Sequence, residues 1–314
     1  MRAATIREQE IVIEQHPDPE PGSEEVLVRV HAAGLNGADM MQRRGLYPAP
    51  PGSPQDIPGM EFAGEVAARG PGAERFDVGD RVMGIVGGGA QAELLTVHER
   101  VLMPVPADLD WPAAGGLPEV FTTAHDAVFT QGELRPSERL LVHGGAGGVG
   151  TAAIQLARAC GARVTATVRN EALRDQVAAL GASVIACDGF AEHGPFDVIL
   201  ELVGGPNMPE NMTALATGGR ITVIGVSAGA KSELNLLALM GKRARIHGST
   251  LRARPLEQKA LVARLVEQEV LPLFESSALT VPIADTFPLD EAAAAYERFA
   301  AGGKLGKVVL AMGD

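Results

Sequence analysis

The stretch "HGGAGGVGTAAIQLARACGARVTATVRN", from His143 to Asn170, decides how the middle of this 314-residue chain folds. Five of the seven residues from Gly144 to Gly150 are glycines, placed between the apolar run "LLV" and a helix-type apolar pattern. This arrangement predicts a tight turn that joins a buried strand to a helix. Glycine costs backbone entropy in such a place, which indicates that a function compensates for the cost.

The glycines fit the pattern G-x-G-x-x-G at Gly145, Gly147 and Gly150. In a strand–turn–helix unit the first glycine makes the turn, the second lets the backbone approach a pyrophosphate, and the third lets the helix pack on the strand. The N–H groups at the start of the helix then face the phosphates. The predicted cofactor-binding turn comprises Gly145, Ala146, Gly147, Gly148, Val149 and Gly150.

Strand and helix patterns alternate from about Pro118 to Thr250. The strand candidates include "LLVHG", "RVTATV", "SVIAC", "FDVILELVGG", "GRITVIGV" and "RARIHGST". Such alternation predicts a six-stranded parallel Rossmann sheet covered by helices. Gly204, Gly225 and Val226 follow two of these strands at their carboxyl ends, where open α/β sheets bind cofactors, so we expect them to contact the cofactor.

The first 115 residues or so have a different pattern, in which short runs of alternating apolar and polar residues, such as "EVLVRVHAAG", are broken by Gly and Pro. They predict a compact, β-rich, barrel-like domain. A long helix pattern, "PLEQKALVARLVEQEVLPLF", is followed by one more helix and a closing strand. Because the Rossmann sheet already has six strands, we expect this tail to return to the first domain. The predicted fold is therefore α/β, with residues 118–254 binding the nucleotide and residues 1–117 and 255–314 forming the second domain.

Arg169 stands 19 residues past Gly150, at the end of the second predicted strand. A chain that binds NADH usually has Asp or Glu there for the ribose 2′-hydroxyl, whereas an arginine suits the 2′-phosphate of NADPH. A solvated surface arginine is the alternative interpretation. Asp188, after the third strand, would repel a 2′-phosphate, but Arg169 is nearer the expected position. The residues thus favour NADPH over NADH.

The composition excludes several classes of function. The formal net charge is −12, so the chain is not expected to bind nucleic acid. Two cysteines rule out a disulfide framework and a four-cysteine zinc site. No apolar run approaches a bilayer span and the N-terminus lacks a signal peptide's apolar core, so we expect a cytoplasmic protein with no membrane partner.

The chain resembles the medium-chain dehydrogenase/reductase superfamily, in particular its zinc-lacking, zeta-crystallin-like quinone oxidoreductase branch. The resemblance covers nearly the whole chain. It depends on "GLNGADMMQRRGLYPAPPG", "IPGMEFAGEV", "LPEVFTTAHDAV", the glycine stretch, and "GSTLRARPLEQK". It implies that the β-rich domain is GroES-like.

The resemblance also implies that no zinc is bound. Zinc-dependent relatives have a catalytic cysteine where this chain has Asn36 and a histidine where it has Met60. Neither residue supplies the thiolate or imidazole that such a site needs. Without zinc, the expected chemistry is hydride transfer from a nicotinamide to an acceptor that is already electrophilic.

Candidate site residues follow from the same resemblance. It brings the loop after "VLVRVHAAG" to the nicotinamide cleft, with Asn36, Asp39, Gln42 and Tyr47. The Tyr47 hydroxyl is suited to hydrogen-bond an acceptor carbonyl or to relay a proton; packing on a proline-rich loop is the alternative. The resemblance also places Thr123, Leu251 and Arg252 near the cofactor.

Three functions remain open at this stage. The first is an NADPH-dependent quinone oxidoreductase, the second an enoyl or alkenal reductase that acts on an enone, and the third an NADPH-binding protein with a structural or RNA-binding role and little turnover. The resemblance further implies a homodimer that pairs the last Rossmann strand, in "RARIHGST", across a twofold axis.

Overall fold

The computed structural model describes residues 1–313, which divide into two compact units. The first unit contains residues 1–122, residues 251–302 and the C-terminal segment that begins at Lys307, and the second contains Thr123–Thr250 and Gly303–Gly306. Most of the C-terminal part of the chain therefore belongs to the first unit. Within residues 1–313 no helix has both the length and the apolar character needed to cross a bilayer.

The first unit is built on a mostly antiparallel sheet with the strand order β14-β15-β3-β4-β5-β7, and β6 also pairs with β3. Along β3, Val26, Val28 and Val30 are buried and alternate with more exposed residues, which gives the sheet one core-facing side. This confirms the prediction of a β-rich domain. The strands are β1 (Arg2–Arg7), β2 (Glu10–Gln15), β3 (Glu25–Gly34), β4 (Glu61–Arg69), β5 (Arg81–Ile85), β6 (Leu94–His98), β7 (Leu102–Pro104), β14 (Ile283–Pro288) and β15 (Lys307–Ala311).

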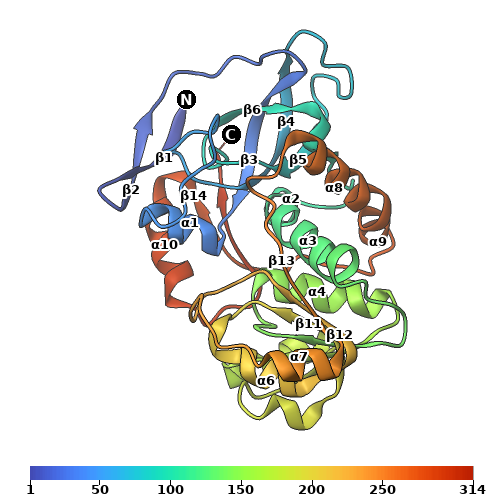
Figure 1. Ribbon diagram of the computed structural model, residues 1–314. Coiled ribbons are helices and arrows are strands. Elements are labelled where there is room, and N and C mark those ends of the chain that lie inside the picture. The colour runs from blue at the N-terminus through green and yellow to red at the C-terminus, as the bar shows by residue number, and fades with distance from the viewer. Residues whose placement is uncertain (314) are drawn as a thin grey trace. The chain divides into compact units, whose positions relative to one another are not determined.

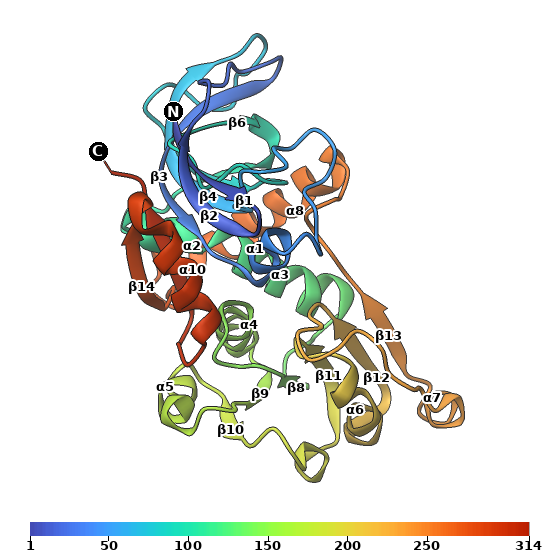
Figure 2. The ribbon, with the colours of Figure 1, turned by 90° about the vertical axis from the view of Figure 1, so that its left-hand side faces the viewer.

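Helices of the first unit pack on this sheet, and α10 contacts β2, β14 and β15 (Figure 2). The long helix predicted over residues 255–274 is in fact two helices that meet at Val270. Pro272, in the first turn of the second helix, lacks the N–H group that a continuous helix would need. The helices are α1 (Gly37–Arg43), η1 (Glu99–Val101), α2 (Trp111–Gly116), α3 (Pro118–His125, which continues into the second unit), α8 (Leu256–Glu269), α9 (Leu271–Glu275), η6 (Leu289–Glu291) and α10 (Ala292–Ala301).

The second unit contains a six-stranded, fully parallel sheet with the order β10-β9-β8-β11-β12-β13. The order reverses between β8 and β11, which makes the carboxyl ends of these two strands the expected ligand site of an open α/β sheet. The strands are β8 (Arg139–Val142), β9 (Arg163–Thr167), β10 (Ser183–Ile185), β11 (Phe196–Glu201), β12 (Leu215–Val223) and β13 (Arg245–Gly248).

Helices cover both faces of this sheet, with α4 on one face and α6 and α7 on the other (Figure 1). Leu141 and Ile199 pair in register and point to the face under α6, where they form a core with Phe196 and Met212. The sequence therefore predicted both the strand type and the six-strand count. The helices are η2 (Asp126–Gln131), α4 (Gly148–Ala159), η3 (Glu171–Leu173), α5 (Arg174–Ala179), η4 (Phe190–His193), η5 (Gly205–Asn207), α6 (Met208–Ala214) and α7 (Leu236–Lys242).

Candidate functional site

The glycine turn joins β8 to α4 and has the shape that a dinucleotide needs. A Cβ on Gly150 would lie 2.4 Å from the Gly144 carbonyl oxygen, and one on Gly145 would lie 2.8 Å from the Ala166 side chain. These two glycines therefore allow the helix and the strand to pack closely. A Cβ on Gly147 would meet one atom within 4 Å, the Gly144 oxygen at 3.5 Å. The position of a Gly147 side chain is thus open at the start of α4, while the Gly147 backbone forms a bridge with Gly306. The amino end of a helix carries N–H groups that suit a phosphate.

The other members of the predicted turn lie where the sequence places them. Ala146 precedes the helix, and its carbonyl accepts a hydrogen bond from Gly306 N at 2.9 Å. Gly148 and Val149 begin α4. The turn thus fits a pyrophosphate by its backbone, and the nicotinamide cofactor would be held there.

Two further loops leave the same edge of the sheet, after β11 and β12. Gly204 has a φ of 111°, and a Cβ on Gly225 would lie 2.5 Å from the Leu202 carbonyl oxygen. Val226 follows and is 40% exposed. Gly205 N donates to the Gly229 carbonyl at 2.8 Å and ties the two loops together. Glycine is required here because the loops approach backbone to backbone.

A buried polar network beneath these loops was missed by the sequence analysis. His143 Nε2 lies 2.8 Å from Asn211 Oδ1, and Asn211 Nδ2 donates to Glu201 Oε2 at 2.6 Å. Because the Asn211 oxygen only accepts, His143 carries its proton on Nε2, and its Nδ1 faces the Thr167 hydroxyl at 3.2 Å. Burial lowers the pKa of His143, so the ring is neutral.

This network connects the turn after β8 with the loop after β11. Glu201 Oε1 accepts from Val203 N at 2.6 Å and from Gly204 N at 2.8 Å, while the Thr167 hydroxyl accepts from Gly144 N at 3.3 Å. In the sequence, His143 and Glu201 each lie at a strand end just before glycines. That position was the feature of the sequence that could have indicated the network. We infer that the network holds both loops in place.

Arg169 is exposed and directly follows the strand end at Thr167–Val168. Burial raises the pKa of the Cys187 thiol, and the positive charges of Arg169 and Arg174 offset part of this rise. The exposed position leaves the guanidinium accessible to a ligand at this edge of the sheet.

In the first unit, Asp39 lies fully buried on α1. Its carboxylate accepts from Asn36 N at 2.8 Å and from Gly59 N at 3.2 Å, and so ties α1 to the loop before β4. Burial raises the pKa of Asp39 to about 6, although Lys307 and Arg252 partly oppose the shift. These contacts give the side chain a role in orienting the backbone.

The raised pKa of Asp39 predicts a pH-dependent stability. The folded state holds the proton more tightly than the unfolded chain, so Asp39 contributes stability that is full below about pH 4 and is lost as the pH rises through about 6. We expect the difference in unfolding free energy between the wild type and Asp39→Asn to change by about 2 kcal/mol between pH 4 and pH 7. Urea unfolding across this range measures it. A difference for Asp39→Asn that does not vary with pH would contradict the prediction.

Asn36 belongs to a buried ionic cluster with Glu61 and Lys307. Lys307 Nζ lies 2.6 Å from Glu61 Oε1 and 2.8 Å from Asn36 Oδ1, and Asn36 Nδ2 donates to Glu61 Oε1 at 2.8 Å. Glu61 Oε2 also accepts from Glu119 N at 2.8 Å. A Cβ on Gly34 would lie 2.4 Å from Glu61 Oε1, which explains the glycine at the end of β3. The Asn36 side chain therefore holds its loop through its hydrogen bonds with Glu61 and Lys307.

The chemistry of this cluster shows whether Asn36 and Met60 could belong to a zinc site. The carboxamide oxygen of Asn36 faces the Lys307 ammonium, which repels a cation, and the Met60 thioether is a poor zinc ligand. No group of three or more His, Cys, Asp or Glu side chains in the described part of the chain is placed to hold a metal. The residues present do not fit a zinc site.

Arg252 is buried and connects Gln42 to Tyr47. Its guanidinium donates to the Gly87 carbonyl at 2.7 Å, to the Tyr47 carbonyl at 3.1 Å and to Gln42 Oε1, and it lies 5.1 Å from the centre of the Tyr47 ring. No hydrogen bond joins the Tyr47 hydroxyl to another residue within residues 1–313. Arg252 thus holds the Tyr47 ring and backbone, and the Tyr47 hydroxyl has no hydrogen-bond partner among residues 1–313.

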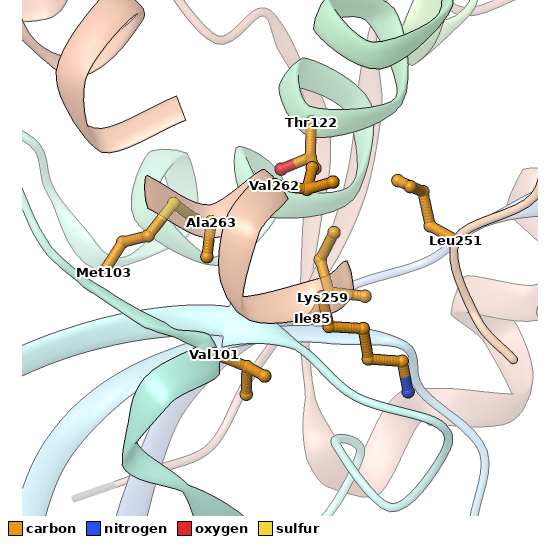
Figure 3. A pocket seen from close by; sticks show the side chains of 8 residues that line it. All are labelled: Ile85, Val101, Met103, Thr122, Leu251, Lys259, Val262 and Ala263. Carbon is orange, nitrogen blue, oxygen red and sulfur yellow. The ribbon is translucent and has the colours of Figure 1, made fainter. Parts of the chain in front are cut away.

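The two remaining predicted residues are buried. Thr123 lies on α3 and is the first residue of the second unit, and Leu251 begins the return to the first unit. Leu251 lines an apolar cavity in the first unit with residues of β5, β7 and α8 (Figure 3).

Comparisons with known proteins identify the family. Residues 22–107 match the model of the alcohol dehydrogenase GroES-like domain, and residues 148–267 match that of the zinc-binding dehydrogenases. A quinone oxidoreductase of Rattus norvegicus is 32% identical over 305 residues, which cover 93% of this chain and 90% of the relative. The chain belongs to the quinone oxidoreductase family. The human quinone oxidoreductase is likewise 32% identical, over 306 residues with the same coverage.

Solved structures agree with this membership. An alcohol dehydrogenase superfamily protein from Novosphingobium aromaticivorans has a TM-score of 0.89 and 31% identity, with all of both chains covered. A mycobacterial protein in complex with NADPH has a TM-score of 0.88 and 26% identity, with 99% of this chain and 100% of that chain covered. The resemblance and the predicted fold are thus confirmed, and this quinone oxidoreductase family member is an oxidoreductase with a nicotinamide cofactor.

Proposed function

We propose that this protein is an NADPH-dependent quinone oxidoreductase that works without zinc. The observation that carries the proposal is the turn at Gly147, where a Cβ would meet a single atom of residues 1–313 within 4 Å, in a chain that is 32% identical to quinone oxidoreductases over 93% of its length. We further propose that the second unit binds the cofactor and the first unit binds the acceptor, with the boundaries near residues 118 and 254.

The chemistry needs few protein groups. When bound, the nicotinamide would supply a hydride, and the uptake of one proton would complete the two-electron reduction of a quinone to the hydroquinone. The Tyr47 hydroxyl, which has no hydrogen-bond partner within residues 1–313, would donate to the acceptor carbonyl. Arg252 and Gln42 position Tyr47, and Asn36 and Asp39 hold the loop on which it lies. In this proposal Arg252 acts through Tyr47 and not on a phosphate.

The absence of zinc is part of the proposal. The Asn36 side chain lies against the Lys307 ammonium, whereas a zinc site needs anionic or neutral ligands. A quinone is already electrophilic, so its reduction does not depend on a Lewis acid. Metal analysis of the purified enzyme before and after dialysis against a chelator, with activity measured on both samples, tests this point.

The acceptor is tested by oxidation of NADPH followed at 340 nm. We expect rapid turnover with 1,4-naphthoquinone and slow turnover with trans-2-hexenal or a short enoyl thioester. The reverse order would favour the enoyl or alkenal reductase function. Tight NADPH binding with no turnover of any acceptor would favour a binding protein, although the net charge of −12 argues against RNA as its partner.

Arg169 should determine the preference for NADPH. A charge-assisted hydrogen bond to the 2′-phosphate contributes about 1.5–3 kcal/mol, so Arg169→Ala should weaken NADPH binding roughly tenfold to a hundredfold and leave NADH binding unchanged. Fluorescence titration with both nucleotides measures the effect. Arg163→Ala, at the other end of β9, is the matched control. Equal affinity of the wild type for the two nucleotides would overturn this assignment.

A homodimer that extends the Rossmann sheet completes the proposal. Within residues 1–313, β13 pairs on one side only and forms the edge of the sheet (Figure 2). Next to it, Leu236, Leu237 and Met240 of α7 are 63%, 77% and 71% exposed. An open strand edge beside exposed apolar side chains favours association with a second copy.

Sedimentation equilibrium tests the dimer. We expect twice the chain mass of 32.7 kDa for the wild type and a shift toward the monomer for the double variant Leu237→Lys and Met240→Lys. Leu261→Lys, on α8 of the first unit and 62% exposed, should not change the mass. A wild-type monomer at high concentration would refute the dimer. We also propose a cytoplasmic location, which cell fractionation tests.

A further inference from the structure

Strand β11 ends in a buried carboxylate, Glu201, that no cation neutralises. Its side chain is 0% exposed, and no Lys or Arg among residues 1–313 forms an ion pair with it. His143 Nε2 lies 3.7 Å from Glu201 Oε2, but burial keeps the His143 ring neutral. N–H donors compensate the carboxylate instead. They are Val203 N at 2.6 Å, Gly204 N at 2.8 Å and Asn207 Nδ2 at 3.3 Å on Oε1, and Asn211 Nδ2 at 2.6 Å on Oε2.

These partners fit an ionised carboxylate. All four groups donate, so a proton on either oxygen of Glu201 would face a donor and not an acceptor. The negative charge therefore sets the direction of the neighbouring hydrogen bonds. Asn211 turns its nitrogen to Glu201 and its oxygen to His143 Nε2, and His143 Nδ1 then accepts from the Thr167 hydroxyl.

Glu201 holds both loops at this edge of the second unit. Its side chain takes the N–H groups of Val203 and Gly204, in the loop after β11. Its backbone carbonyl accepts from Ile224 N at 2.9 Å and from Gly225 N at 3.2 Å, where the loop after β12 begins. One residue thus determines the position of two loops that leave neighbouring strands.

The two halves of the Rossmann sheet differ in what their first turn offers to a ligand. Such a sheet consists of two mononucleotide-binding halves, here β8 with β9 and β10, and β11 with β12 and β13. The turn at Gly147 in the first half suits a phosphate. In the second half, the N–H groups of Val203 and Gly204 already donate to Glu201. The carboxylate takes the donors that a phosphate would use, which favours the nicotinamide ring and its ribose at the second half.

We propose that Glu201 is a positioning residue for the nicotinamide end of the cofactor. Its carboxylate turns the Val203 and Gly204 N–H groups inward, and its carbonyl fixes the start of the loop after β12. Replacing its side chain should therefore weaken binding of the whole dinucleotide and leave binding of the adenosine part unchanged. That the dinucleotide is NADPH rests on the proposed function.

Nucleotide binding by the purified enzyme tests the assignment. Glu201→Met keeps the length of the side chain but removes both acceptor oxygens, so it should raise the Kd for NADPH about tenfold or more. Adenosine 2′,5′-bisphosphate contains the adenosine part of NADPH without the nicotinamide, and its Kd should stay within about threefold of the wild-type value. Glu201→Gln should largely restore the affinity for NADPH, because its oxygen still accepts from the two N–H groups. Calorimetric titration measures these constants.

Ile199→Ala separates positioning from stability. Ile199 is a buried core residue of the same strand, so the variant should have a lower unfolding temperature but a wild-type Kd for NADPH. If Glu201→Met does not fold, Glu201→Asp, whose shorter side chain draws the carboxylate away from the two N–H groups, provides the same comparison. Wild-type affinity for NADPH in the Glu201 variant that folds, or an equal loss for NADPH and the bisphosphate, would overturn the assignment.

Kinetics distinguish this assignment from the proposed function. With saturating NADPH, Glu201→Met should lower kcat for 1,4-naphthoquinone about tenfold and leave KM for the quinone within about twofold, because the nicotinamide is misplaced. If the wild type reduces no acceptor but the difference between the two nucleotides is found, the quinone oxidoreductase function fails and the role of Glu201 stands. If the wild type binds NADH in place of NADPH, the NADPH assignment fails, and NADH compared with 5′-AMP tests Glu201 in the same way.

Discussion

Replacing Lys307 by methionine should lower the free energy of unfolding by about 3–5 kcal/mol. The side chains of Lys307 and Glu61 are 3% and 0% exposed, and their charged atoms are 2.6 Å apart. Without the ammonium, the Glu61 carboxylate stays buried, with the Glu119 N–H and the Asn36 amide as its remaining donors among residues 1–313. An uncompensated buried charge is the reason for the large cost.

Urea unfolding of three variants separates the charge effect from lost packing. The double variant Glu61→Gln and Lys307→Met removes both charges and should be more stable than Lys307→Met alone. Arg100→Met breaks an exposed pair with Glu257 and should cost less than about 1 kcal/mol. If Lys307→Met and Arg100→Met lower the free energy of unfolding by the same amount, the buried pair of Lys307 and Glu61 stabilises the fold no more than an exposed pair does. Because Lys307 also holds the Leu35 carbonyl at 2.7 Å, we expect reduced turnover at temperatures where the variant is folded.

The second large effect is expected at the glycine turn, where Gly150→Ala should lower stability and abolish cofactor binding together. The new Cβ would lie 2.4 Å from the Gly144 oxygen and 2.9 Å from Gly145 Cα, and backbone atoms cannot move away as a side chain can. We expect a loss of about 3 kcal/mol, or a fall of roughly 10 °C in the unfolding temperature.

Gly147→Ala is the matched comparison at the same turn. Its Cβ would have a single contact, at 3.5 Å, so the variant should keep the wild-type unfolding temperature. It should still weaken NADPH binding strongly, because the methyl group occupies the space left for the pyrophosphate. Calorimetric unfolding and nucleotide titration of both variants measure the two effects. A stable Gly150→Ala variant that binds NADPH would contradict the assignment of the turn as the pyrophosphate site. A Gly147→Ala variant with unchanged affinity for NADPH would contradict it as well.

Much of the second unit was predictable because its signals are local. The pattern of glycines from Gly144 to Gly150 specifies a turn between a strand and a helix at fixed spacing, and apolar strands that alternate with helices specify a parallel sheet. The boundary at Val270 was missed because one proline at the start of α9 ends a periodic pattern that otherwise continues.

The polar groups beneath the surface were not predictable in the same way. His143, Thr167, Glu201 and Asn211 are each ordinary residues in their own segments, and they become a network because parallel strands end at one edge.

The sequence by itself determined the family, the two kinds of domain and the position of the nucleotide turn, because each depends on residues close together in the chain. Only the tertiary structure decided which charges meet. Lys307 contacts Asn36 across 271 positions, and Arg252 contacts Gln42 across 210. The antiparallel pairing of β15 with β3 sets the first contact, and the return of the chain at Leu251 sets the second. The physical reason is that such charges are stable inside a protein only when hydrogen-bond acceptors or opposite charges compensate them, and local sequence does not specify which distant groups do so.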